Sequence, residues 1–173
     1  MNYNDLKNYE YAPFYKPYIE EIGQELTILS GLEVIGNEFV DLIDSLSDEK
    51  LNFAYAKNKW TIKEVIVHLI DAERIFSYRA LRFARNDKTD LSGFEENDYV
   101  PFSEANKRSK VDLITEFKAV RNSTISLFQS FSDEMLFRVG TIGGNAMSVR
   151  ALGFIILGHQ KHHINVLQER YLI

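Results

Sequence analysis

Apolar residues recur every three or four positions in four separate segments, and this spacing constrains the fold more than any other feature of the chain. The four segments cover residues 32–46, 62–83, 113–131 and 152–166. The apolar stripe of the first segment consists of Leu32, Ile35, Phe39, Leu42 and Leu46. Such stripes lie on one face of a helix. With no alternating strand pattern beside them, they predict an all-α protein, a bundle of four amphipathic helices.

Polar residues that cap helix N-termini precede three of these segments. Thr61 and Glu64 form a capping box, in which each side chain accepts a hydrogen bond from a free backbone N–H group near the helix start. Ser109 and Ser148 are the predicted N-caps of the third and fourth helices. The first helix is predicted to begin near Glu25, after a stretch that contains prolines.

The length of the chain, 173 residues, fits a single domain with its own apolar core. Within residues 1–173 we expect the bundle to occupy about 25–172 and an N-terminal extension to occupy 1–24. Residues 86–110 have neither helical nor strand periodicity, and a segment of this length inside a domain is usually functional or mobile. It is either a solvated crossover that joins two helices or a lid over a site.

A weak internal repeat divides the chain into two similar halves. The motif Ser-Asp-Glu follows the first helix at residues 47–49 and the third helix at 132–134, and a capped helix comes next in both cases. Two copies of a helix pair would form a bundle with a pseudo-twofold axis. Alternatively, Ser-Asp-Glu is simply a common N-cap sequence.

The absence of cysteine restricts the chemistry of the chain. It excludes disulfides, a protein thiolate nucleophile and cysteine-ligated metal sites, so a metal would have to be bound by His, Asp or Glu. A formal net charge of −5 argues against binding of nucleic acid. The N-terminus resembles no targeting signal, and no apolar run approaches the ~20 residues of a membrane span. These features favour a cytoplasmic protein that contacts no membrane.

Three of the four histidines fall on inward faces of two predicted helices. His159 and His163 are four residues apart on the apolar stripe of the fourth helix, so their imidazoles project from one face. His68 lies on the second helix, and counting from the two N-caps puts it one turn from the level of His159. His162 points to one side and is a poorer partner. Three imidazoles could therefore meet at one divalent metal ion and leave positions open for water or substrate.

Simpler explanations of these histidines stay open. A pair at this spacing is often only two polar side chains, and a single inward histidine is usually a hydrogen-bonded core residue. A His-Glu-x-x-His metalloprotease is excluded, because no glutamate follows His159. Asp71, three residues after His68, is a candidate to orient a ligand imidazole or a bound water. Glu73 and Arg74 are expected to form salt bridges along their own helix.

Two parts of the chain resemble one known family. Residues 59–74 and 79–85 are similar to the second helix of the DinB-like (YfiT-like) superfamily, while residues 148–153 and 158–163 are similar to its fourth helix. Residues 91–94 also fit the crossover loop of this group. The resemblance covers nearly the whole chain and implies a four-helix bundle of up-down-down-up topology that often forms homodimers.

The resemblance also implies a metal site. Members of the superfamily bind a divalent metal, commonly nickel or zinc, through one histidine of the second helix and a His-x-x-x-His pair of the fourth. The corresponding positions here are His68, His159 and His163. Characterised relatives include thiol S-transferases that use bacillithiol and a mycothiol-dependent isomerase. Many other members are described provisionally as metal-dependent hydrolases.

These features favour a metal-dependent enzyme that joins a low-molecular-weight thiol to a small electrophilic substrate. The metal would lower the pKa of the thiol, as it does for water. Because the chain has no cysteine, the sulfur would come with the cosubstrate. A hydrolase would use the same three ligands. From a different class, a non-catalytic bundle that dimerises or binds a partner would leave the histidines with a structural role.

Overall fold

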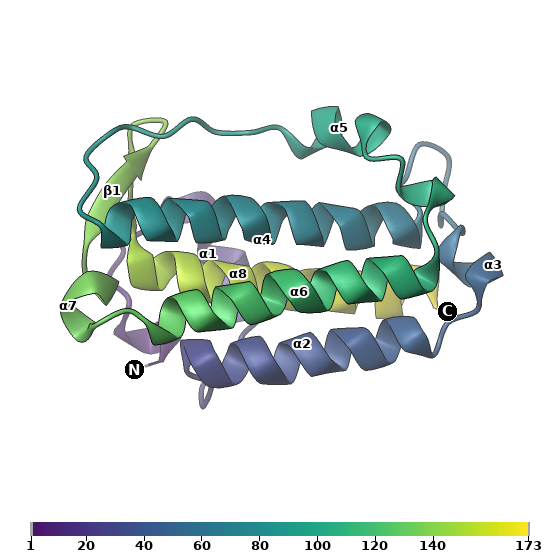
Figure 1. Ribbon diagram of the computed structural model, residues 1–173, viewed down its shortest axis with the longest axis horizontal. Coiled ribbons are helices and arrows are strands. Elements are labelled where there is room, and N and C mark those ends of the chain that lie inside the picture. The colour runs from purple at the N-terminus through teal and green to yellow at the C-terminus, as the bar shows by residue number, and fades with distance from the viewer. Residues whose placement is uncertain (1, 173) are drawn as a thin grey trace.

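The computed structural model describes residues 2–172, and its four longest helices form the predicted bundle (Figure 1). They are α2 (Ile28–Asp44), α4 (Ile62–Ala84), α6 (Lys110–Gln129) and α8 (Val149–Val166). In Figure 1, α2 and α8 run in one direction and α4 and α6 in the other, so the up-down-down-up topology is confirmed. Both α2 and α4 pack against α6 and α8. Within residues 2–172, no helix combines the length and the apolar character needed to cross a bilayer.

The long helices begin at the residues that cap them. The Oγ1 atom of Thr61 accepts a hydrogen bond from the backbone N–H of Glu64 (3.2 Å), and Oε2 of Glu64 accepts one from the backbone N–H of Thr61 (2.7 Å). The side chains of Ser109 and Ser148 cap α6 and α8, as predicted. The N-cap of α2 is Thr27, so this helix begins at Ile28, slightly later than the predicted start near Glu25. The last turn of α8 continues as a π-helical turn, Leu167–Tyr171.

The segment 86–110 is long because it joins two parallel helices. A chain that leaves the end of α4 must return along the whole bundle to reach the start of α6, and a 23-residue helix is about 35 Å long. The sequence shows no helical period here, but the segment contains short helical pieces: α5 (Glu96–Tyr99) and 3-10 turns at Val100–Phe102 and Ala105–Lys107. It runs beside α4 in Figure 1. The same segment therefore acts as a crossover and covers one side of α4.

A small β-hairpin, which the helical apolar spacing does not predict, leads into α8. Its strands β1 (Val139–Ile142) and β2 (Asn145–Ser148) pair antiparallel. The turn between them holds Gly143 and Gly144 at φ angles of 55° and 77°, which glycine adopts without steric cost. The backbone of Leu91, in the crossover, adds hydrogen bonds of 3.0 and 2.9 Å to this hairpin. Strands of four residues are too short to show alternation, so their pairing depends on these tertiary contacts.

Both Ser-Asp-Glu motifs adopt the same local structure. Ser47 caps the one-turn helix α3 (Asp48–Leu51), and Ser132 caps the one-turn helix α7 (Asp133–Leu136). The two halves of the chain thus share an order of long helix, short helix and second long helix. Because α2 runs opposite to α6 and α4 runs opposite to α8, the arrangement agrees with a pseudo-twofold axis (Figure 1).

The N-terminal extension is packed onto the bundle. After 3-10 turns at Tyr3–Asp5 and Pro13–Tyr15 it forms the short helix α1 (Lys16–Glu20). This helix lies against α8 at Gly158, where a Cβ atom would be 2.0 Å from the carbonyl oxygen of Tyr18. Nearer the N-terminus, the buried carboxylate of Glu10 forms an ion pair with Arg150. The extension therefore contacts α8 at two places, through Glu10 at Arg150 and through Tyr18 at Gly158.

A polar network crosses the apolar core and joins all four long helices. Arg121 of α6 donates two hydrogen bonds to the Glu73 carboxylate of α4 (2.9 and 2.8 Å) and one to the Leu32 carbonyl of α2 (2.7 Å). It also donates to the side-chain oxygen of Gln160 in α8. The Arg121 and Glu73 side chains are only 6% and 4% exposed. The predicted salt bridge of Glu73 along its own helix is therefore wrong, because its partner comes from another helix.

Candidate metal centre

The three inward histidines come from two helices that run antiparallel. His68 lies in the second turn of α4, whereas His159 and His163 lie near the C-terminal end of α8. Because α4 and α8 point in opposite directions, the start of one meets the end of the other (Figure 1). Counting residues from both N-caps assumes that the two helices run in the same direction, so the count does not give the relative positions of histidines on α4 and α8. The structure thus brings the side chains together, although not for the reason that the repeat suggests.

The three imidazoles form one compact cluster. One nitrogen atom from each ring lies within 4.8 Å of the corresponding atoms of the other two. The Nε2 atoms of His68 and His159 are 3.0 Å apart, and the ring centroids are separated by 4.7 to 5.0 Å. Among residues 2–172, this is the group of His, Asp and Glu side chains placed to share a metal ion.

Burial keeps these histidines neutral. His68 is 7% exposed, and desolvation lowers its pKa to about 4. Desolvation, with a further contribution from the neighbouring imidazoles, lowers the pKa of His163 to about 3 and holds the pKa of His159 well below its usual value. An imidazole coordinates a metal only in its neutral form. At neutral pH the cluster is therefore in its ligating state.

The separation of two of the imidazoles also fits ligation of one divalent metal. Nitrogen atoms that ligate one ion at about 2.0–2.1 Å lie about 2.8–3.4 Å apart when the bond angle is between about 90° and 109°. The distance between the Nε2 atoms of His68 and His159 is in this range. The Nδ1 atom of His163 is buried and has no hydrogen-bond partner among the described residues. A buried polar atom of this kind is costly unless another group satisfies it.

The lowered pKa values predict how the metal-free protein responds to acid. Between pH 6.5 and about 4, the unfolded chain binds protons at these histidines and the folded chain does not, so the free energy of unfolding falls as the pH decreases. A pKa difference of one corresponds to about 1.4 kcal/mol. Urea unfolding of chelator-treated protein across this pH range measures the effect. Replacement of all three histidines by alanine should remove most of it, and an unchanged slope in that variant would contradict the prediction.

His162 and Asp71 lie outside the cluster. The Nδ1 atom of His162 is 3.0 Å from Oε1 of Glu21. Asp71 pairs with Arg74 at 3.7 Å, and no hydrogen bond described for residues 2–172 joins it to a histidine. Burial raises the pKa of Asp71, although it is next to the Arg74 guanidinium. The role of Asp71 in orienting an imidazole or a water stays a prediction.

Aromatic rings enclose the histidines. Tyr18 and Phe76 lie against His159, with centroid distances of 5.6 and 6.1 Å, and Trp60 packs against His68 at 4.9 Å. No sequence signal marks Tyr18, because its position depends on how the N-terminal extension docks onto α8. The sequence does suggest that Trp60 lies near His68, since Trp60 precedes the cap of α4 and lies about two helical turns before His68.

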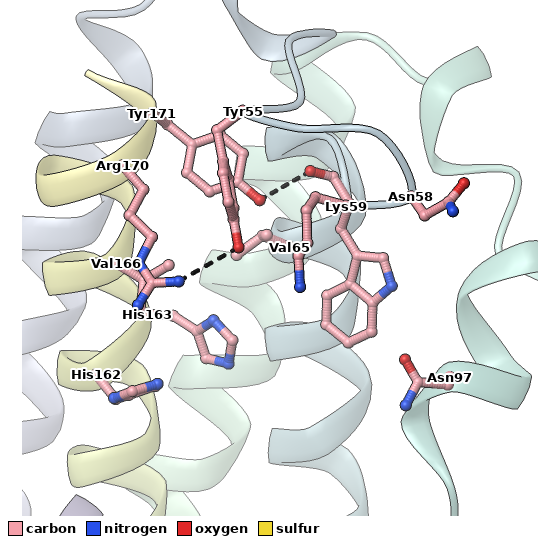
Figure 2. Close-up of a pocket in the computed structure, with 11 residues that line it drawn as sticks. Tyr55, Asn58, Lys59, Val65, Asn97, His162, His163, Val166, Arg170 and Tyr171 are labelled. Carbon is pink, nitrogen blue, oxygen red and sulfur yellow. Dashed lines mark hydrogen bonds between the residues drawn. The ribbon is translucent and has the colours of Figure 1, made fainter. Parts of the chain in front are cut away.

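Cavities large enough for a small molecule reach the cluster on two sides. One, of about 340 Å³, is lined by His163 with residues of the loop before α4 and of the last turn of α8 (Figure 2). The other, of about 380 Å³, is lined by His68 and His159 with aromatic residues of the N-terminal extension and the crossover. The crossover borders both cavities, through Asn97 in the first and Glu96 in the second. Both volumes are within the range of small-molecule sites, about 300–1,000 Å³.

Comparison with known proteins places the chain in a family. The model of the DinB superfamily matches residues 32–167, a range that includes the three histidines and most of the bundle. The chain belongs to the DinB superfamily. It is 23% identical over 139 residues to OB0413 of Oceanobacillus iheyensis, with 79% of each chain covered. It is 22% identical over 161 residues to GK0616 of Geobacillus kaustophilus, with 92% of this chain and 90% of the relative covered. Both relatives are named provisionally as metal-dependent hydrolases.

A solved structure supports the fold of this DinB-superfamily chain. YfiT from Bacillus subtilis matches it with a TM-score of 0.75 and 14% identity, over 92% of this chain and 91% of YfiT. YfiT is described as a probable metal-dependent hydrolase with an unusual four-helix bundle topology. The DinB-like, YfiT-like resemblance of the second and fourth helices is thus confirmed for family and fold.

Proposed function

We propose that this DinB-superfamily protein is a metal-dependent enzyme acting on small molecules, with nickel or zinc held by His68, His159 and His163. The observation that carries the proposal is the meeting of three neutral imidazoles beside two cavities of small-molecule size. The names of OB0413 and GK0616 also support metal dependence. A purely structural histidine cluster gives no reason for the unpartnered, buried Nδ1 atom of His163.

The protein's own groups prepare this site for catalysis. A divalent ion, when bound, would act as a Lewis acid and lower the pKa of a water or thiol. The rings of Tyr18, Phe76 and Trp60 cover part of the His159 and His68 imidazoles and limit their contact with water, which strengthens electrostatic interactions there. Arg79 lines the second cavity, is 3% exposed and donates a hydrogen bond to the Ser92 carbonyl (2.8 Å). It supplies a fixed positive charge that suits a developing negative charge on a leaving group.

Within this class we propose transfer of a low-molecular-weight thiol, of the bacillithiol type, to a small electrophile. The chain has no cysteine, so the sulfur nucleophile has to come from the thiol cosubstrate. The thiol proton passes to solvent, the sulfur forms a bond to the electrophilic carbon, and the leaving group departs with the electron pair of its former bond. Two cavities at one cluster suit a reaction between two organic molecules.

Hydrolysis is the second candidate, and the names of OB0413 and GK0616 favour it. Water would then replace the thiol, and one organic substrate would need only one of the two cavities. A non-catalytic homodimeric bundle, the remaining alternative, would turn over neither type of substrate.

A substrate panel tests the proposal. Nickel- or zinc-loaded protein is mixed with chlorodinitrobenzene and, in turn, with bacillithiol, cysteine, glutathione and no thiol, while nitrophenyl esters report hydrolysis. We expect thiol-dependent release of chloride above the uncatalysed rate, with loss of this activity after chelation and recovery after metal is added back. Ester hydrolysis without thiol-dependent turnover would favour the hydrolase. A rate that is unaffected by chelation would overturn the metal-dependent mechanism.

A further inference from the structure

The cavity in Figure 2 carries positive charge that none of its lining side chains neutralises. Lys59 and Arg170 line it, and no Asp or Glu does. Within residues 2–172 neither of these cations forms an ion pair, and Arg170 contacts the hydroxyl (3.4 Å) and the ring of Tyr55. We propose that this cavity binds a small organic carboxylate, which serves as the anionic reactant at the metal centre. Its role as a reactant rests on the proposed function, whereas the binding itself does not.

Carboxylates that adjoin the cavity are already engaged elsewhere. Oε2 of Glu64, on the first turn of α4, accepts a hydrogen bond from the Thr61 backbone (2.7 Å), and its Oε1 accepts one from Asn106 (3.1 Å). Glu21 contacts the lining residue His162 at 3.0 Å, on the side of α1. In a protein with a net charge of −5, two cations that face one cavity without an acidic partner are suited to an anionic ligand.

The walls of the cavity suit a molecule that has an anionic head and a less polar body. The hydroxyl of Tyr171 donates a hydrogen bond to the Trp60 carbonyl (2.8 Å), which ties the last turn of α8 to the loop before α4. Tyr55 packs edge-on against Tyr171, with a centroid distance of 4.8 Å. Asn58 and Asn97 add amide groups to the lining. These contacts hold the aromatic wall of the cavity in place, whereas Lys59 and Arg170 are exposed side chains that can adjust to a ligand.

The positions of the cations favour a carboxylate directed toward the histidines. In Figure 2, the side chains of Lys59 and Arg170 come from different walls of the cavity and both extend toward His163. A guanidinium binds the two oxygens of a carboxylate through a planar pair of N–H groups, and an ammonium adds a further charged donor. A carboxylate held between them would keep the rest of the molecule next to the cluster.

The second cavity has a different character, which gives the two reactants separate places. Phe14, Phe76 and Phe94 line it, together with the carboxylates of Glu95 and Glu96. The guanidinium of Arg79 also lines this cavity but is outnumbered by the two carboxylates, so a ligand carboxylate is less favoured here than in the first cavity, and a less polar electrophile is favoured beside the aromatic rings. The carboxylate-bearing reactant would therefore approach the cluster from the His163 side, and the electrophile from the side of the second cavity.

The single tryptophan of the chain, Trp60, lines the cavity and provides the test. Its emission is recorded during titration with succinate at constant ionic strength, for zinc-loaded and for chelator-treated protein. Uncharged succinamide is the control ligand. We expect a saturable response to succinate in both forms and little response to succinamide. Arg170→Gln and Lys59→Gln should each raise the apparent dissociation constant about tenfold, the effect of one lost charge-assisted hydrogen bond. Lys57→Gln, an exposed neighbour outside the lining, should leave it unchanged.

The proposal would be overturned by the absence of a succinate response in the wild-type protein, by an equal response to succinamide, or by an unchanged dissociation constant in the Lys59→Gln, Arg170→Gln double variant. A response that needs zinc and ignores both cations would also overturn it, because the carboxylate would then sit on the ion. Metal content measured on the same samples separates this inference from the proposed function. Metal-free protein that binds succinate through Arg170 supports the carboxylate site even if the metal-dependent mechanism fails.

Discussion

Replacing His159 with alanine is expected to remove the metal from the protein and to abolish metal-dependent turnover. The Nε2 atom of His159 is 3.0 Å from that of His68, and the ring centroid of His159 is 4.7 Å from that of His163. Loss of groups that only orient metal ligands weakens metal binding by about 10–100-fold. Loss of one of three ligands should therefore weaken it by more than about 100-fold. Elemental analysis after dialysis, followed by a zinc titration, measures this effect for His159→Ala, His163→Ala and His68→Ala.

His162→Ala is the matched control for these variants. His162 is next to His163 on the same helix, but its Nδ1 atom faces Glu21 and its ring lies outside the cluster. We expect this variant to keep about one equivalent of nickel or zinc per chain. Circular dichroism should show that all four variants remain helical. Full metal content in His159→Ala and His163→Ala would contradict the three-histidine site and make Asp71 the first candidate for a carboxylate ligand.

Among the proposed single substitutions, Glu73→Ala is expected to reduce the free energy of unfolding the most. The Arg121 guanidinium would then remain buried with no carboxylate to balance its charge, since the side chain is only 6% exposed. Breaking a buried ion pair in this way costs about 3–5 kcal/mol. A typical domain has a total stability of only about 5–15 kcal/mol. Urea unfolding followed by circular dichroism measures the change in the free energy of unfolding.

Two further variants separate the charge effect from simple loss of packing. The double variant Glu73→Leu, Arg121→Met replaces both charges with apolar groups, and it should recover much of the lost stability because no unpaired charge remains. Lys16→Ala breaks the exposed ion pair with Glu20, whose side chains are both 59% exposed, and should cost less than about 1 kcal/mol. If Glu73→Ala cost no more than this exposed control, the network would not have the importance that its burial indicates.

The Arg121 network also shows where sequence reasoning misjudges a helix. The apolar spacing of residues 113–131 continues through Val120 and Leu127, but the structure leaves these two half-buried and buries Arg121 and Phe128 at the neighbouring positions. A charged residue is assigned to the solvent face by periodicity alone. Here Glu73, Gln160 and a backbone carbonyl satisfy it inside the core. The compensation comes from three other helices, so one segment read in isolation does not reveal it.

The effect of acid on metal binding by the histidine cluster also depends on burial in the folded protein, which the sequence pattern does not show. An ordinary imidazole would lose a metal below about pH 6.5, and retention at lower pH would suggest carboxylate ligands. Burial lowers the pKa of His68 to about 4 and the pKa of His163 to about 3, so histidine ligands can hold a metal well below pH 6.5. Metal retention in mild acid therefore does not distinguish histidine from carboxylate, and the alanine variants are needed instead.

The sequence by itself determined the four helices, most of their first residues and the helix faces that carry the histidines. These features depend on apolar period and on capping bonds such as Thr61 with Glu64, which involve residues within one or two turns. Only the tertiary structure decided that the start of α4 meets the end of α8, that Tyr18 and Trp60 enclose the imidazoles, and that Lys59 and Arg170 share a cavity. These outcomes depend on the direction in which helices pack and on the docking of distant segments. A local pattern contains no information about which distant side chains will meet, because their contacts form only when the whole core is assembled.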